Sequence, residues 1–218
     1  MDKLELIIKN LPYISQGIMT TLFLTVVALA CGFVVGLALS LLRLYGGTAA
    51  AGLTVAYGRI IRGLPLLVIM IIFYLFIADL LRLSTLLTAA LALGLHSSAY
   101  QAEIFRAAIQ SVGSGQMMAA RSLGLSRFQA LRYVILPQAL RLALPAWSNE
   151  AAIVLKDSSL AYAIGAAELL RRSEYVSART YEPLLVFSTC GLIYLLLTMA
   201  TNRILGVLEL KYRIPSGH

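Results

Sequence analysis

The segment Ile18–Leu42, IMTTLFLTVVALACGFVVGLALSLL, decides the fold class, because it is apolar throughout and contains no Asp, Glu, Lys or Arg. A helix of about 20 such residues crosses a hydrocarbon core of about 30 Å. Four other segments are also candidate spans: Ile60–Ala78, Leu86–Ile109, Ala139–Leu155 and Leu184–Val207. The sequence therefore predicts an all-α, polytopic membrane protein with about five transmembrane helices.

Composition supports this class. Hydrophobic residues make up 60% of the 218 residues and charged residues only 13%, with a mean hydropathy of +0.84. A soluble domain has about 25% charged residues, and one large core helix accounts for one or two apolar segments but not five. No low-complexity segment interrupts the chain, so residues 1–218 are predicted to form a single transmembrane domain.

The two cysteines and the N-terminal segment have ordinary structural explanations. Cys31 and Cys190 each lie inside an apolar span, where cysteine behaves as a small hydrophobe, so we predict neither a disulfide nor a metal site. Asp2 and Glu5 do not suit a signal peptide, so the first span is expected to remain. The mixed segment 1–17 suggests a short amphipathic helix on the outer surface, ending near Pro12.

The distribution of basic residues predicts the orientation. Five spans place the two termini on opposite faces, and most of the 18 Lys and Arg residues fall on the face of the 113–137 loop and the C-terminal tail. The positive-inside rule makes this face cytoplasmic, with the N-terminus outside and the C-terminus inside. The net charge of +8 then reflects span ends near anionic lipid, and nucleic-acid binding is not expected.

The basic segment Gln116–Pro137, QMMAARSLGLSRFQALRYVILP, lies between the third and fourth spans. Good helix formers flank Gly124, which can adopt backbone angles closed to other residues. The pattern predicts a short helix, a sharp turn and a second helix that ends at Pro137, because the residue before proline resists the helical conformation. In the first span, Gly32 and Gly36 form a small-xxx-small pair that permits close helix packing.

The spacing of Ala119-Ala120, Gly124 and Leu136-Pro137 resembles the "EAA" coupling loop of ABC importer permeases. Met118 departs from this pattern, because the family generally has Glu there, and Gly113 stands where Pro is usual. One branch of this family serves polar amino acids (histidine, arginine, glutamine, glutamate, opines). Four stretches of this chain resemble sequence elements of that branch: RGLPLL at 62–67, AYQAEIFR at 99–106, PQALR at 137–141 and KDSSL at 156–160.

The resemblance implies a membrane subunit of an ATP-driven importer in the bacterial cytoplasmic (inner) membrane. It implies an identical or homologous permease partner, an extracytoplasmic solute-binding protein that docks on the external loop 165–183, and ATPase subunits that grip the coupling loop 113–137. The coupling residues are then Gln116, Met118, Ala119, Ala120, Arg121, Gly124, Leu125 and Arg127. The sequence lacks a P-loop motif, so the chain is not expected to be an enzyme or to hold a cofactor. ATP and Mg belong to the partner ATPase.

Ionisable residues within spans are candidates for a solute site. Glu150 follows Pro137 by ~20 Å of helix and His96 follows Leu86 by ~15 Å, so both are predicted near the middle of the bilayer. With Ser97, Tyr100 and Asn149 they form the predicted substrate-binding set. A carboxylate suits an α-amino group or a cationic side chain. The alternative is that Glu150 and His96 form a structural pair.

Two other classes of function fit the sequence less well. An ion-driven secondary transporter or channel predicts inverted repeats and broken helices, which the sequence does not indicate. An intramembrane enzyme requires a nucleophile with its base, or a metal cluster, and the two histidines His96 and His218 are far apart in the sequence.

Overall fold

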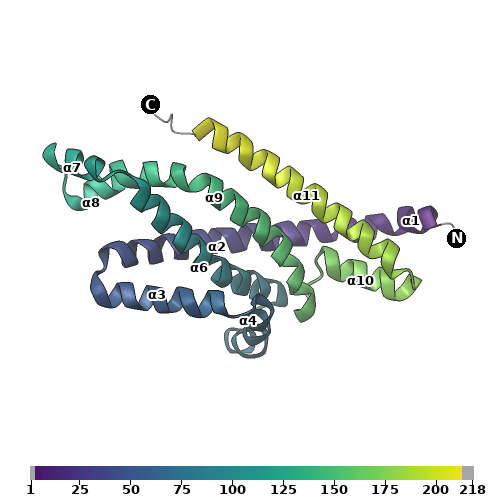
Figure 1. Ribbon diagram of the computed structural model, residues 1–218. Coiled ribbons are helices and arrows are strands. Elements are labelled where there is room, and N and C mark those ends of the chain that lie inside the picture. The colour runs from purple at the N-terminus through teal and green to yellow at the C-terminus, as the bar shows by residue number, and fades with distance from the viewer. Residues whose placement is uncertain (1–2, 213–218) are drawn as a thin grey trace.

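The computed structural model describes residues 3–212 and contains no strand within that range. Asp2 and His218 lie outside the described residues. Figure 1 shows long helices lying side by side, with α7 and α8 at one end of the bundle and α1 and α10 at the other. The elements are α1 (Lys3–Ser15), α2 (Gly17–Tyr45), α3 (Gly47–Gly63), α4 (Leu66–Ile72), the π-helical η1 (Phe73–Ile77), α5 (Ala78–Leu81), α6 (Thr85–Ser111), α7 (Ser114–Ser122), α8 (Arg127–Ala130), the π-helical η2 (Leu131–Ile135), α9 (Leu136–Asp157), the 3₁₀-helical η3 (Ser158–Ile164), α10 (Leu169–Thr180) and α11 (Pro183–Tyr212).

The predicted all-helical class is confirmed for these residues. Two helices are long and apolar enough to cross a membrane, Lys3–Tyr45 and Pro183–Tyr212. The number rises to three if the bent pair of α3 with α4–α5 is counted as one span. The third and fourth predicted spans correspond to the helices α6 and α9. The number of five spans stays a prediction.

The N-terminal segment differs from its prediction. Its helix does not end near Pro12 but continues to Ser15, and α1 and α2 together form one element of 43 residues. Such a helix is about 65 Å long, roughly twice the thickness of a hydrocarbon core. Contacts with α10 hold the segment around Pro12: Arg179 Nη2 donates to Asn10 Oδ1 at 2.6 Å, and Arg172 lies over the ring of Tyr13.

The second predicted span, Ile60–Ala78, is not a straight helix. The chain bends by 100° between α3 and α4, at Leu64 and Pro65, which both have extended ψ values. Proline has no N–H to donate and disfavours a helical conformation at Leu64, so the helix ends at Gly63 and a new one begins after Pro65.

The contact between α2 and α6 forms the centre of the bundle. Glycines allow it: a Cβ atom at Gly36 would lie 2.9 Å from the backbone nitrogen of Ala102 and 3.0 Å from the carbonyl oxygen of Ser98. A Cβ at Gly94 would lie 3.0 Å from the Cβ of Cys31. The predicted close approach at Gly32 and Gly36 is confirmed, and α9 packs on the other side of α6.

The segment after α6 forms the predicted hairpin of helices. Helix α7 ends at a turn in which Gly124 has φ +85°, a conformation that favours glycine. Ser126 and Gln129 then form a capping box that begins α8.

The end of the hairpin differs from its prediction, because no helix ends at Pro137. The π-helical η2 runs directly into α9, with the Leu136 N–H bonded to Leu131 O, five residues back. Pro137 occupies the first turn of α9, where a missing N–H is tolerated. The hairpin is therefore joined to α9 without a break.

We predict that Gly36→Ala destabilises the folded chain by about 1–3 kcal/mol, because the added methyl group meets the backbone of α6 rather than a mobile side chain. Gly52→Ala is the matched control, since nothing lies within 4 Å of a Cβ at Gly52 in α3. Thermal unfolding in detergent measures both variants. An unchanged midpoint for Gly36→Ala would contradict the close packing of α2 and α6.

Candidate functional site

A buried polar network joins α2, α6 and α9. Ser97 Oγ donates to Glu150 Oε1 at 2.7 Å, and Gln101 Nε2 donates to Ser97 Oγ at 3.0 Å and to the carbonyl oxygen of Leu29 at 3.3 Å. Trp147 Nε1 donates to Gln101 Oε1 at 2.8 Å. Glu150 is only 5% exposed. Within Lys3–Tyr212 its carboxylate accepts the hydrogen bond from Ser97 and forms no ion pair with a cation. The network brings together two residues of the predicted solute set, Ser97 and Glu150.

The other three residues of that set lie on more accessible faces. His96 is half-buried and its ring lies 5.1 Å from the ring of Tyr100, while Tyr100 and Asn149 are exposed. Tyr100 is one helical turn from Glu103, and Asn149 is one turn from Ala146. Glu103 and Ala146 both line a groove of about 510 Å³ between α6 and α9. The predicted residues thus divide into a buried pair, Ser97 and Glu150, and three more accessible residues that do not themselves line this groove.

Three arginines converge on Glu103, a residue that the sequence did not mark as part of a site. Arg43 Nη1 donates to Glu103 Oε1 at 2.5 Å, Arg106 Nε donates to Oε2 at 2.7 Å, and Arg62 Nη2 lies 3.4 Å from Oε1. These side chains come from α2, α6 and α3. Glu103 and Arg106 could have been noticed as charged residues inside a predicted span, but the convergence of Arg43 and Arg62 depends on tertiary structure.

The predicted coupling residues lie on the hairpin of α7 and α8, at the end of the bundle opposite α10 (Figure 1). Ala120 is buried and its carbonyl oxygen accepts from the Leu125 N–H, which closes the turn around Gly124. Arg121 Nη1 donates weakly to Leu125 O at 3.4 Å, and Gln138 Nε2 donates to Gln116 Oε1 at the same distance. Arg127 lies over the ring of Tyr45, at the end of α2.

The outer surface of this hairpin is apolar at several positions. Leu123, at the tip, is 84% exposed, and Met118 and Phe128 are also exposed. Ala119, which follows Met118, is exposed as well but has only a small side chain. Large apolar side chains exposed on a basic segment are typical of a protein contact. Met118, which stands where the resembled family has Glu, is part of this apolar surface.

The segment 165–183 is not an irregular loop, because it contains helix α10. Glu168 caps that helix by accepting from the N–H groups of Leu170 and Arg171 at 2.7 and 2.6 Å, and it accepts from Tyr194 Oη at 2.7 Å. Its side chain is fully buried, and burial raises the pKa of the Glu168 carboxyl while these hydrogen bonds oppose the rise. The Leu169 N–H also donates to Thr21 Oγ1 at 3.3 Å, which ties α10 to α2.

Residues 3–212 contain no group of three or more His, Cys, Asp or Glu side chains arranged to hold a metal ion. The arrangement described above is that of a helical membrane protein with a small polar network inside the bundle and, at one end, a basic hairpin that exposes several apolar side chains.

Comparison with known proteins identifies the family. Residues 32–214 match the family of binding-protein-dependent transport system inner membrane components, and the chain belongs to this family. The nopaline transport system permease protein NocM of Agrobacterium fabrum is 36% identical over 217 residues, covering 94% of this chain and 90% of that protein. The glutamine transport system permease protein GlnP of Escherichia coli K12 is 36% identical over 208 residues, covering 94% of each.

Solved structures agree with this assignment. The structure of an amino acid ABC transporter with histidines has a chain that is 34% identical to this one and superposes with a TM-score of 0.86, covering 97% of this chain and 99% of that one. The MetNI methionine ABC transporter shares the fold, with a TM-score of 0.82 at 21% identity over 94% of this chain and 98% of that one. The family that the sequence motifs resembled is therefore confirmed.

We predict that Tyr194→Phe destabilises the chain by about 1–3 kcal/mol, because it removes a hydrogen bond from a fully buried carboxylate at Glu168. Tyr74→Phe, on an exposed part of η1, is the matched control and should leave the unfolding midpoint within experimental error. If the two substitutions shift the midpoint equally, Glu168 does not depend on Tyr194.

Proposed function

We propose that this chain is the transmembrane subunit of an ATP-driven ABC importer for a polar amino acid. Family membership supports the role of an inner-membrane component, and the names of the relatives support an amino acid as the solute. The observation that carries the proposal is the hairpin of α7 and α8, which presents exposed Leu123, Met118 and Phe128 at one end of the bundle. None of the relatives and structures named above favours the ion-driven alternative.

In this proposal the chain crosses the membrane five times, through α2, the bent element α3–α5, α6, α9 and α11. The hairpin end faces the cytoplasm and the α10 end faces outward, with the N-terminus outside. Residues 1–218 then form one permease domain. A second copy, or a homologous permease, completes the solute path.

The ATPase partner is proposed to grip residues 113–137. The exposed side chains Met118, Leu123 and Phe128 would bury their apolar area in the partner, and Gln116, Ala119 and Arg121 would border that contact. Ala120, Gly124 and Leu125 would preserve the shape of the turn, and Arg127 would join the hairpin to α2 through Tyr45. Because α8, η2 and α9 are joined without a break, movement of the hairpin would reach Glu150 along one helical element.

ATP hydrolysis is proposed to occur on that partner, which would hold ATP and Mg. This division agrees with the absence of a P-loop motif from the sequence. On the opposite end, α10 and the rest of segment 165–183 are proposed to receive an extracytoplasmic solute-binding protein.

The solute is proposed to pass along the groove between α6 and α9 and on past the accessible residues one or two helical turns from its lining. His96, Tyr100 and Asn149 would touch it, while Glu150, held by Ser97, would supply negative charge from within the bundle. A buried carboxylate that has no cation partner among residues 3–212 favours a solute that carries an ammonium or other cationic group.

We expect Glu150→Gln to lower uptake of a cationic amino acid by roughly tenfold, equivalent to ~1.4 kcal/mol. The amide oxygen of the new side chain can still accept from Ser97, so the network should survive without its charge. Uptake into proteoliposomes that contain the assembled transporter measures the effect, and Glu209→Gln in α11 is the control. Unaltered uptake after the Glu150→Gln substitution would remove Glu150 from the solute path.

Replacing Leu123 by Ser tests the coupling surface. We expect co-purification of the ATPase partner to fall by more than about tenfold, because burying an exposed leucine side chain contributes about 1.5–3 kcal/mol. Leu184→Ser is the matched control, since Leu184 is 82% exposed and Leu123 is 84% exposed, but Leu184 lies at the opposite end of the bundle. Equal retention of the ATPase by both variants would count against the hairpin as its docking surface.

A further inference from the structure

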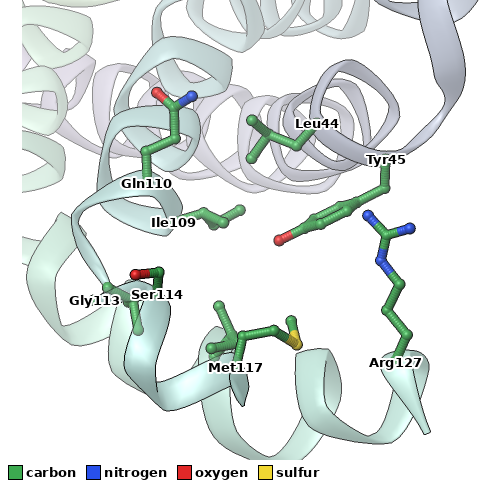
Figure 2. A pocket seen from close by; sticks show the side chains of 10 residues that line it. Leu44, Tyr45, Ile109, Gln110, Gly113, Ser114, Met117 and Arg127 are labelled. Atoms are coloured by element: carbon green, nitrogen blue, oxygen red, sulfur yellow. The ribbon is translucent and has the colours of Figure 1, made fainter. Parts of the chain in front are cut away.

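A pocket of about 290 Å³ lies where the hairpin meets the ends of two long helices. The last turn of α2 contributes Leu44 and Tyr45, the last part of α6 contributes Ile109, and the hairpin contributes Ser114, Met117 and Arg127. Figure 2 shows Arg127 beside Tyr45 at one edge of this pocket, with Ser114 and Met117 on the hairpin side. The proposed function assigns no ligand to this space.

The pocket has one cationic edge and an apolar floor. The guanidinium of Arg127 lies 5.3 Å from the centre of the Tyr45 ring, and the hydroxyl groups of Tyr45 and Ser114 add hydrogen-bonding capacity. Leu44, Ile109 and Met117 supply the apolar surface.

The positive charge of this region has no acidic counterpart nearby in the sequence. Segment 114–135 contains Arg121, Arg127 and Arg132 but no Asp or Glu. Among the ion pairs formed within Lys3–Tyr212, none includes Arg127. An anion bound from outside the chain would neutralise the charge of this guanidinium. A planar guanidinium can donate two hydrogen bonds to the oxygens of one phosphate group.

We propose that this pocket binds the phosphate group of an anionic phospholipid headgroup. The phosphate oxygens accept from Arg127 and Tyr45, and the glycerol backbone lies against Leu44, Ile109 and Met117. A volume near 290 Å³ is at the lower end for ligand pockets, which suits a headgroup whose acyl chains remain outside.

The position of the pocket favours lipid over a soluble phosphate ester. It lies at the end of α2, where Leu42, two residues before Leu44, is 49% exposed and offers a surface for acyl chains. Basic pockets between membrane helices on the cytoplasmic side are typical sites for acidic headgroups. Because its walls come from both the long helices and the hairpin, a bound headgroup braces the hairpin against the bundle.

The test uses the purified full chain in a neutral detergent and measures its unfolding midpoint. A ligand that binds only the folded chain raises this midpoint with increasing concentration. Short-chain phosphatidylglycerol should raise it, whereas short-chain phosphatidylcholine, which has no net charge, should raise it much less. Arg127→Gln should weaken the apparent affinity for phosphatidylglycerol by roughly tenfold. Arg132→Gln is the matched control, because Arg132 also lies over a tyrosine ring on the hairpin but does not line the pocket.

Glycerol phosphate forms a separate arm that distinguishes the two sources of phosphate. A shift with phosphatidylglycerol but not with glycerol phosphate supports the lipid, and an equal shift with both overturns the lipid assignment in favour of a soluble phosphate ester. Tyr45→Phe retains the cation and should weaken binding less than Arg127→Gln, which provides a second measurement if Arg127→Gln folds poorly. Equal shifts with both lipids, or an unchanged shift in Arg127→Gln and Tyr45→Phe, would overturn the site. None of these outcomes bears on transport, because the measurement requires neither ATPase nor solute.

Discussion

The close contact of α2 with α6 is the constraint on which the rest of the structure depends. It requires that no side chain project from α2 at Gly32 and Gly36, because the backbone of α6 and the side chain of Gln101 occupy that space. Gln101 in turn bonds to Leu29, Ser97 and Trp147, so the packing of the two helices positions the polar network that reaches Glu150. Close packing of small residues is what holds helices together where lipid competes for apolar surface.

The two ends of the bundle are connected to this centre in different ways. At the α10 end, Gly17 lies against the backbone of Leu169, and Glu168 links α10 to Tyr194 of α11. At the hairpin end, α9 continues directly from η2, and Arg127 contacts Tyr45 at the end of α2. A force applied to either end would therefore act on a helix that packs against α6, since α2 is connected to both ends, and this is the physical requirement for coupling two distant surfaces through one bundle.

Charge is distributed unevenly along the bundle, and three regions differ in how their charged side chains are paired. The buried Glu150 accepts a hydrogen bond from Ser97 and has no cation partner among the residues described, whereas Glu103 is surrounded by three arginines that tie α2, α3 and α6 together. The hairpin carries arginines and no acid at all. The second arrangement stabilises tertiary structure, whereas the first and the third leave charge available to groups outside the chain.

The sequence by itself determined the class, the family and the hairpin, because each depends on local signals: apolar length, motif spacing, and a glycine between two helix-forming segments. Only the tertiary structure decided the rest. The continuation of the helix through Pro12 is held by contacts between residues far apart in the chain, such as Arg179 with Asn10, and α10 is tied to α2 and α11 in the same way. Proline acts locally both at the bend after Leu64 and in the unbroken passage into α9 at Pro137, but only the structure shows which of its two effects operates at each position. The helical rise per residue placed His96 and Glu150 at similar depths, but only packing showed that Glu150 turns inward to Ser97 while Asn149 is exposed.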